Sequence, residues 1–467
     1  MATLIHAAAF VNASGDVLDG RVLLDETGIL AFGDEAIALG NRATETDADV
    51  ELEEVHLSSQ VLLPAFVNAH SHAFQRVLRG RVEHRSEAFP EDDFWSWRKE
   101  MYTAALSLSA DAFEAVTAWC YLDMVRAGFS AVGEFHYVHH DEDGNAYGTP
   151  LLSLGAARAA EKVGLQITLL NTAYERAGPG QDALQEQRRF VFSDVQAFLE
   201  HSREVRDIVK GAGVRHGLAI HSVRACSSSW RQALAEEAGH HLLPLHVHAC
   251  EQVAELEACQ RHYGKNPLQV LDEDGVLSER CAIVHATHID REDVQLLAAR
   301  GTQVVLCPST ERNLGDGLCP ILDLHEAQIP LSIGTDSHAR IDPVDELRSL
   351  EDHERLRLQR RNVLTKPGKS VRHALLYPGT LGGRRALGLP IEAGKEGGDV
   401  VSIPLGVLGK AFGPGAAVDA FLVGGAGQSG VQNMWSRGIR VLQEGNVRGC
   451  DEQGIENAAR EVLKTLG

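Results

Sequence analysis

Residues 61–72 read VLLPAFVNAHSH, an apolar run that leads into two histidines one residue apart. The apolar part has the length and composition of a buried β-strand, in which side chains at positions i and i+2 point to the same side. His70 and His72 are therefore expected to lie together at the end of a strand, where they could bind one metal ion. An H-x-H pair alone does not establish such a site, because a histidine at a strand end is more often a hydrogen-bonded core residue.

Seven further apolar runs follow this one, with longer helical patterns between them. The runs are SAVGEF (130–135), QITLL (166–170), GLAI (217–220), LPLHVHA (243–249), CAIVHA (281–286), QVVLCP (303–308) and PLSIGT (330–335). Among the helical patterns, 251–264 and 291–301 end in glycine, as helices often do. Alternating strands and helices predict βα units and a parallel sheet, and eight strands predict a (β/α)8 TIM barrel, an α/β fold.

The two ends of the chain have a different pattern, in which short β-rich runs alternate with turn signals. Strand-like runs after residue 378 are DVVSIPL (399–405), VDAFLVGG (418–425) and GIRVLQEGNVRG (438–449). Because each end alone would bury little apolar surface, both are expected to pack together as one small β-sandwich domain. The expected division is 1–62 for the N-terminal part of this domain, 63–377 for the metal-binding barrel, and 378–467 for the C-terminal part with a terminal helix.

The composition is that of a globular protein, with 44% hydrophobic and 23% charged residues among 467. We find no apolar run long enough to span a membrane and no signal-peptide pattern, so a cytoplasmic protein is expected. The net charge of −21 disfavours nucleic acid and anionic membranes as partners, and an anionic substrate would need a local cluster of cations. Eight scattered cysteines without a C-x-x-C pair indicate free thiols in a reducing compartment.

Two more potential metal ligands stand at expected strand ends. His248 ends LPLHVHA, in which His246 is a second candidate, and Asp336 follows PLSIGT. Because barrel strands bring their carboxyl ends to one face, the sequence predicts a metal centre made of His70, His72, His248 and Asp336. Three nitrogens and one carboxylate with an open position suit one catalytic divalent ion. The set accepts zinc, iron or cobalt, and zinc is expected.

Catalytic residues are expected beside this centre. Glu251 lies three residues past His248 and could move a proton between the attacking water and a departing nitrogen. His285 closes the sixth strand run and could orient the nucleophile or stabilise charge on the substrate. His288 is expected to be structural.

These residues together resemble the amidohydrolase superfamily, and in particular its mononuclear deaminase branch. The shared pattern is H-x-H after the first strand, H-x-x-E after the fifth, His after the sixth and Asp after the eighth. The resemblance implies a metal-dependent barrel flanked by a β-domain from both chain ends. No lysine stands at the fourth-strand position that a carbamylated binuclear member would use, which favours one metal.

Within that branch the barrel is similar to the formimidoylglutamate deiminases, which hydrolyse N-formimino-L-glutamate to N-formyl-L-glutamate and ammonia in histidine breakdown. The matching segments are HSHAFQR, EFHYVHH, HSVRA, CEQ, HATH, NLGDG and DSH, all within residues 68–338. The resemblance implies attack by metal-activated water, a homodimer, the catalytic residues Glu251, His285 and Asp336, and His221 near the formimino group. It further implies that the substrate's carboxylates are bound by Gln75, Arg98, Tyr137 and Arg224. Arg76 takes no role from it.

Three positions depart from that family's pattern: Ile220 replaces a usual proline, Thr335 a serine and Arg312 an alanine. The extra charge of Arg312 near the barrel mouth could alter which acid is accepted, and the sequence does not decide this.

Three other functions remain open. The chain could be a deaminase of a nucleobase or a related amidine-like compound, although such a substrate needs no paired carboxylate receptors. It could cut the other C–N bond and give formamide and glutamate. It could also be a non-catalytic scaffold, but such relatives commonly lose metal ligands, and all are present here.

Overall fold

The computed structural model describes residues 2–46, 52–85, 93–211, 213–391, 398–424 and 430–466. Eight parallel strands lie side by side in chain order. They are β6 (Phe66–Ser71), β7 (Phe129–His136), β8 (Gln166–Ala173), β9 (Arg215–Ser222), β10 (Leu245–Ala249), β11 (Cys281–His285), β12 (Gln303–Leu306) and β13 (Leu331–Ile333). A parallel bridge between Ser71 and Asp336 joins the first strand to the segment after the last, so the barrel is nearly closed. The predicted TIM barrel is confirmed.

Helices cover the outside of the barrel, and residues of β6, β7, β10 and β11 are buried along their whole length. The helices include α3 (Ala110–Ala127), α4 (Leu151–Val163), α5 (Val195–Lys210), α6 (Ser228–His241), α7 (Val253–Tyr263), α8 (Pro267–Glu273), α9 (Arg291–Arg300), α10 (Pro308–Leu314), α11 (Ile321–Glu326), α12 (Pro343–Leu358) and α13 (Arg372–Gly379). Gly264 and Gly301 end α7 and α9 with φ of 68° and 66°, as their positions in the sequence predicted.

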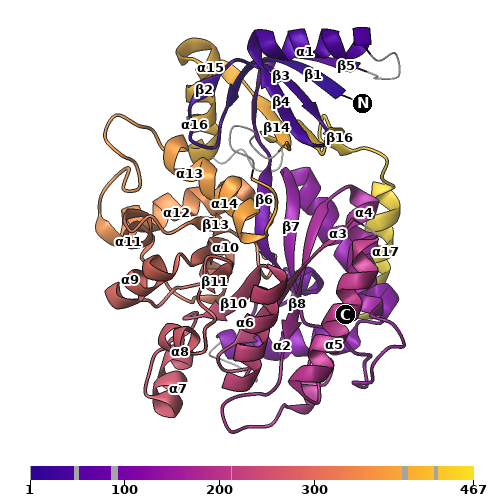
Figure 1. Cartoon of the computed structure of the whole chain (residues 1–467), viewed down its shortest axis with the longest axis vertical. Helices are drawn as coiled ribbons and strands as arrows, with labels where there is room; N and C mark the ends of the chain where they lie inside the picture. Colours follow the sequence, from indigo (N-terminus) through magenta and orange to yellow (C-terminus); the bar gives the residue numbers. More distant parts are fainter. Residues whose placement is uncertain are drawn as a thin grey trace.

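The chain ends form a separate nine-stranded sheet, which confirms a β-domain built from both ends. Its strands are β1 (Ala2–Val11), β2 (Val17–Leu18), β3 (Arg21–Asp25), β4 (Gly28–Phe32), β5 (Leu52–Pro64), β14 (Val400–Pro404), β15 (Asn433–Ser436), β16 (Ile439–Gln443) and β17 (Asn446–Val447). Strand β14 pairs antiparallel with β5 and so joins the two ends. Figure 1 shows this sheet above the barrel, with the indigo N-terminal strands beside the orange β14. Helices α1 (Gly33–Thr46), α15 (Gly406–Phe412) and α16 (Pro414–Gly424) belong to the same region.

Two predicted strands are wrong. The run at 61–67 is not one strand, because β5 ends at Pro64 and β6 begins at Phe66. The chain passes at this point from the sheet of the chain ends to the barrel sheet. Pro64 suits the end of a strand, since proline cannot donate a hydrogen bond to a neighbouring strand. Residues 418–424 of the predicted run at 418–425 lie in helix α16 and not in a strand, and residue 425 lies outside the described residues. The buried side chains Val418, Phe421 and Leu422 recur at helical spacing.

The last segments return to the barrel. Helix α14 (Leu381–Ala386) contacts β6 and β13, and helix α17 (Glu452–Thr465) lies along α3, where Figure 1 draws it in yellow. Arg126 of α3 donates to Glu456 at 2.7 Å and to Glu452 at 3.0 Å. A search of the described helices for one with the length and apolarity of a membrane span finds none.

Candidate metal centre and active-site pocket

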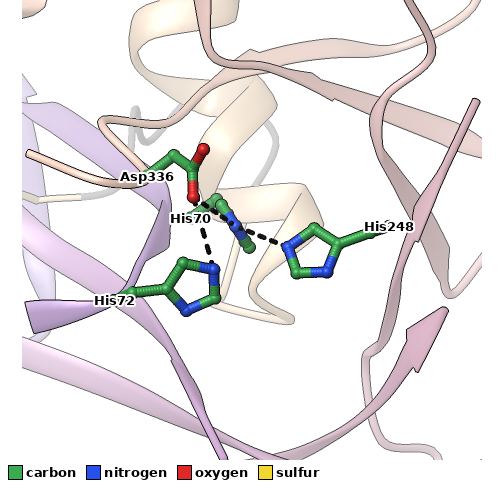
Figure 2. A group of neighbouring side chains, drawn as sticks. All are labelled: His70, His72, His248 and Asp336. Atoms are coloured by element: carbon green, nitrogen blue, oxygen red, sulfur yellow. Dashed lines mark hydrogen bonds and ion pairs between the residues drawn. The ribbon is translucent and has the colours of Figure 1, made fainter. Parts of the chain in front are cut away.

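The four predicted metal ligands converge at the carboxyl ends of the barrel strands (Figure 2). Asp336 Oδ1 lies 3.3 Å from both His70 Nε2 and His72 Nε2, and His248 Nε2 lies 3.1 Å from His70 Nε2. All four side chains are buried. Ligand atoms in a tetrahedral zinc site with bonds of about 2.0 Å lie about 3.3 Å apart, so these residues fit one such ion. The choice that the sequence left between His246 and His248 falls on His248, since His246 Nε2 bonds the Ala386 carbonyl.

The surroundings keep these imidazoles in the form that binds a metal. His72 Nδ1 and His248 Nδ1 lie 3.0 Å and 2.8 Å from the carbonyl oxygens of Phe135 and His221. A proton on each Nδ1 leaves the Nε2 lone pair free for the centre. Burial lowers the pKa of His70 to about 3 and also lowers the pKa of His72 and His248, so all three are neutral near pH 7.

A buried carboxylate on the neighbouring strand fixes the segment that carries the two histidines. Glu134, at the end of β7, accepts from Ser71 Oγ at 2.6 Å and from Ala73 N at 2.8 Å. Ala73 opens the short 3₁₀ helix η1 (Ala73–Leu78). Sequence reasoning did not assign Glu134 a role, although it is the first residue of EFHYVHH. The three histidines of that motif lie outside the pocket lining, and His139 and His140 bond the carbonyls of Thr172 and Val191.

Glu251 and His285 lie beside the metal ligands. Glu251 Oε1 is 3.6 Å from His285 Nε2. Burial raises the pKa of Glu251. Burial opposes charging of His285, but Glu251, Glu311 and Asp336 surround it and raise its pKa above the usual value. Glu255 Oε2 accepts from the backbone nitrogen of Glu251 at 3.0 Å and so helps to hold it.

One pocket opens onto this centre, and within the described ranges its lining includes every predicted site residue except His70. These residues are His72, Gln75, Arg98, Tyr137, His221, Arg224, His248, Glu251, His285 and Asp336. Helix α2 (Phe94–Ser107), which carries Arg98, contributes aromatic residues to the same wall.

Two arginines in this pocket are held by tyrosine hydroxyls. Arg98 Nε donates to Tyr102 Oη at 2.6 Å, and Arg224 Nη1 donates to Tyr174 Oη at 3.3 Å. Gln187, in the 3₁₀ helix η2 (Gln185–Gln187), donates to both hydroxyls at 2.9 Å and 2.8 Å. Burial opposes ionisation of Tyr174, yet Arg224 and Arg98 outweigh it and lower its pKa. The two guanidiniums therefore put positive charge on one side of the pocket, in a chain of net charge −21.

Two more predicted substrate contacts lie on the same side. Gln75 Nε2 donates to Tyr137 Oη at 2.8 Å. The His221 ring lies 4.5 Å from the Tyr174 ring and 5.1 Å from the His248 ring, between the arginine region and the metal ligands. Tyr102, Tyr174 and Gln187 were missed by sequence reasoning, because nothing near them in the chain marks them as neighbours.

Three other polar residues have structural surroundings. Arg76 is buried, pairs with Asp123 and donates to the His338 carbonyl at 2.8 Å. His288 Nε2 bonds the Asp316 carbonyl at 2.8 Å, as expected of a structural residue. Arg312 is not part of the pocket lining; its guanidinium pairs with Asp345 at 2.5 Å on the surface. Arg312 therefore does not contact the pocket directly, and its effect on substrate choice stays a prediction.

Comparisons with known proteins agree with this fold and site. Residues 61–401 match the model of the amidohydrolase family. A formimidoylglutamate deiminase of Pseudomonas aeruginosa is 39% identical over 87% of this chain and 89% of its own. A 5-methylthioadenosine/S-adenosylhomocysteine deaminase of Haloarcula marismortui is 26% identical over 72% of this chain and 71% of its own. The crystal structure of an amidohydrolase from Brucella melitensis has a TM-score of 0.86 and 32% identity, with 99% of both chains covered.

Proposed function

From the premise that this chain belongs to the amidohydrolase family, we propose that it hydrolyses N-formimino-L-glutamate to N-formyl-L-glutamate and ammonia. The observation that carries the proposal is the pair of guanidiniums, Arg98 and Arg224, in the same pocket as the metal ligands. A substrate with two carboxylates and a C=N unit needs both features together. The 39% identity to a named formimidoylglutamate deiminase supports the same choice.

The metal is proposed to be one zinc ion, held by His70, His72, His248 and Asp336. When bound, such an ion supplies a Lewis acid that lowers the pKa of water toward about 7 and so provides a nucleophile at neutral pH. Neutral, buried imidazoles and an ionised carboxylate are the ligand forms that this binding requires.

Glu251 is proposed to move the proton. Its carboxylate takes a proton from the attacking water as oxygen bonds to the formimino carbon, which becomes tetrahedral. It gives this proton to the terminal nitrogen, and it then carries the hydroxyl proton of the tetrahedral carbon to the same nitrogen, which leaves as ammonia while the carbonyl of the formyl group forms. A pKa raised by burial suits a group that must both accept and donate a proton near neutral pH. His285, 3.6 Å away, is proposed to orient the nucleophile.

Arg98 and Arg224 are proposed to bind the two carboxylates, with Gln75 and Tyr137 as further donors and His221 near the formimino group. Planar guanidiniums bind carboxylates through two parallel hydrogen bonds, which fixes the substrate's direction as well as its position. The reacting carbon would then lie on the metal side of His221. A homodimer and a role in histidine breakdown belong to the same proposal.

Product analysis tests this function. Purified, zinc-supplemented protein is incubated with N-formimino-L-glutamate, and ammonia, N-formylglutamate, formamide and glutamate are quantified together. Equimolar ammonia and N-formylglutamate are expected. Formamide with glutamate would mean that the other C–N bond is cut. Ammonia from guanine, cytosine or 5-methylthioadenosine, without turnover of N-formimino-L-glutamate, would refute the proposal in favour of a nucleobase or nucleoside deaminase.

A further inference from the structure

A second carboxylate lies on the other side of the His285 ring. Glu311 Oε1 is 3.5 Å from His285 Nδ1, while Glu251 Oε1 is 3.6 Å from His285 Nε2. Glu311 is 3% exposed and His285 is 1% exposed, so this contact is shielded from water. Resting on the proposed function, we propose that Glu311 is a positioning residue, which holds Nδ1 of His285 so that Nε2 faces Glu251 and the pocket.

The Glu311 side chain is itself held in place. It lies in the first turn of α10, and its Oε1 accepts from the backbone nitrogen of Cys307 at 3.1 Å. Its own backbone nitrogen bonds the Cys307 carbonyl at 3.0 Å. The carboxylate therefore reaches back to the end of β12, and it cannot swing away from His285 without leaving a buried N–H without its partner.

The His285 backbone is constrained to match. His285 and Ala286 have φ of 77° and 51°, in a region that residues with a side chain rarely adopt. The backbone nitrogen of Ala286 bonds the Ala249 carbonyl at 3.2 Å, which ties this turn to the end of β10. The His285 ring stacks on His248 with centroids 5.4 Å apart and an interplanar angle of 20°. The ring is thus fixed by its backbone, by the stacked imidazole and by Glu311.

This arrangement determines which nitrogen faces the reaction. A neutral imidazole carries its proton on either Nδ1 or Nε2, and the hydrogen bond made by one nitrogen decides the state of the other. A carboxylate beside Nδ1 favours a proton on that nitrogen in either charge state of the ring, so Nε2 is the nitrogen that faces Glu251 and the substrate. For histidines that bind a metal, losing the partner of the other ring nitrogen typically costs about 10- to 100-fold in activity, and we expect a loss of the same order at His285.

The test compares Glu311→Gln with the unaltered holoenzyme, by kcat, KM and zinc content. We expect kcat to fall about 10- to 100-fold, with KM and zinc content little changed, because Glu311 does not line the pocket. In a His285→Asn background the same substitution should cost nothing more, since its effect passes through His285. An unchanged kcat, or equal losses with and without His285, would overturn the proposal.

Glu346→Gln is the matched control. Glu346 is another buried carboxylate that supports α10, since its Oε2 accepts from Ser309 N at 2.9 Å. It should lower the melting temperature with little effect on kcat. If Glu346→Gln lowers kcat as much as Glu311→Gln does, the effect is a general one on α10 and the proposal fails.

A readout that needs no turnover separates this inference from the proposed function. In ¹⁵N-histidine-labelled protein, His285→Asn identifies the ring signals of His285, and Glu311→Gln should move the Nδ1 signal, because Nδ1 loses its neighbouring carboxylate whether the ring is neutral or charged. If the substrate is not turned over but this change is seen, the proposed function fails and the positioning role stands. If the Nδ1 signal is the same with and without the Glu311 carboxylate, the positioning role fails, whatever the substrate.

Discussion

Replacing Arg224 by alanine should weaken substrate binding without slowing the chemical step. The hydrogen bonds that the structure describes for this guanidinium all use Nη1, which donates to Tyr174 and to the Ala177 carbonyl. Nε and Nη2 therefore remain for a planar carboxylate in the pocket. Two charge-assisted hydrogen bonds at about 1.5 to 2 kcal/mol each total about 3 to 4 kcal/mol. That loss corresponds to about 10²- to 10³-fold in kcat/KM.

Separate measurements of kcat and KM for Arg224→Ala test whether Arg224 binds a substrate carboxylate. The carboxylate is remote from the reacting carbon, so it should be bound equally in the ground state and the transition state. Steady-state ammonia release should then show a raised KM and a kcat within a few-fold of the original. An unchanged KM would refute the assignment of Arg224 to the carboxylate.

Arg312→Ala is the matched control for this experiment. Arg312 lies outside the pocket and pairs with Asp345, which keeps Arg340 and Arg348 as partners after the substitution. Its removal should leave KM unchanged. A raised KM in Arg312→Ala would show that Arg312 affects acid selection from outside the pocket.

Further outcomes are expected at the metal centre and in the core. Glu251→Gln should lower kcat about 10²- to 10⁴-fold with zinc content retained, and near-full activity would exclude it as the proton carrier. Chelation, or His248→Ala, should abolish activity and lower the melting temperature, with zinc restoring only the chelated protein; an active, metal-free sample would contradict the centre. Burial lowers the pKa of His136 to about 3 and of His201 to about 4. Both are neutral when folded but titrate near pH 6.5 when unfolded, so the unfolding free energy should fall as the pH drops from about 6.5 toward 4. A melting temperature that is flat over this range, or an equal slope in His201→Gln, would count against that cause.

The metal centre could be predicted from the sequence because its information is local. His70 and His72 follow a strand-like run at a spacing of two, and the geometry of a strand alone puts them on one side. His248 and Asp336 each end a run of the same kind. Once the runs are assigned to one barrel, the shared face at the carboxyl ends of the strands brings all four together.

The support around the centre could not be predicted, because it depends on tertiary contacts. Glu311 is an acidic residue in a short helix, and only the packing of α10 turns it toward His285. Tyr102 and Tyr174 lie far apart in the chain, and Gln187 joins them from a third segment. The run at 418–425 shows a related limit, since a short apolar stretch is compatible with a buried strand or a buried helix.

The pairing of β5 with β14 also has a consequence for how the protein is made. Residues 60–64 of β5 pair with 400–404, so the ribosome must synthesise the whole barrel before β5 obtains this neighbour. Until then β5 has an open edge on that side, although it leads directly into the strand with His70 and His72. An open edge can pair with other nascent chains. We therefore expect the yield of folded enzyme during translation to depend on chaperones that shield this strand until the C-terminal residues emerge.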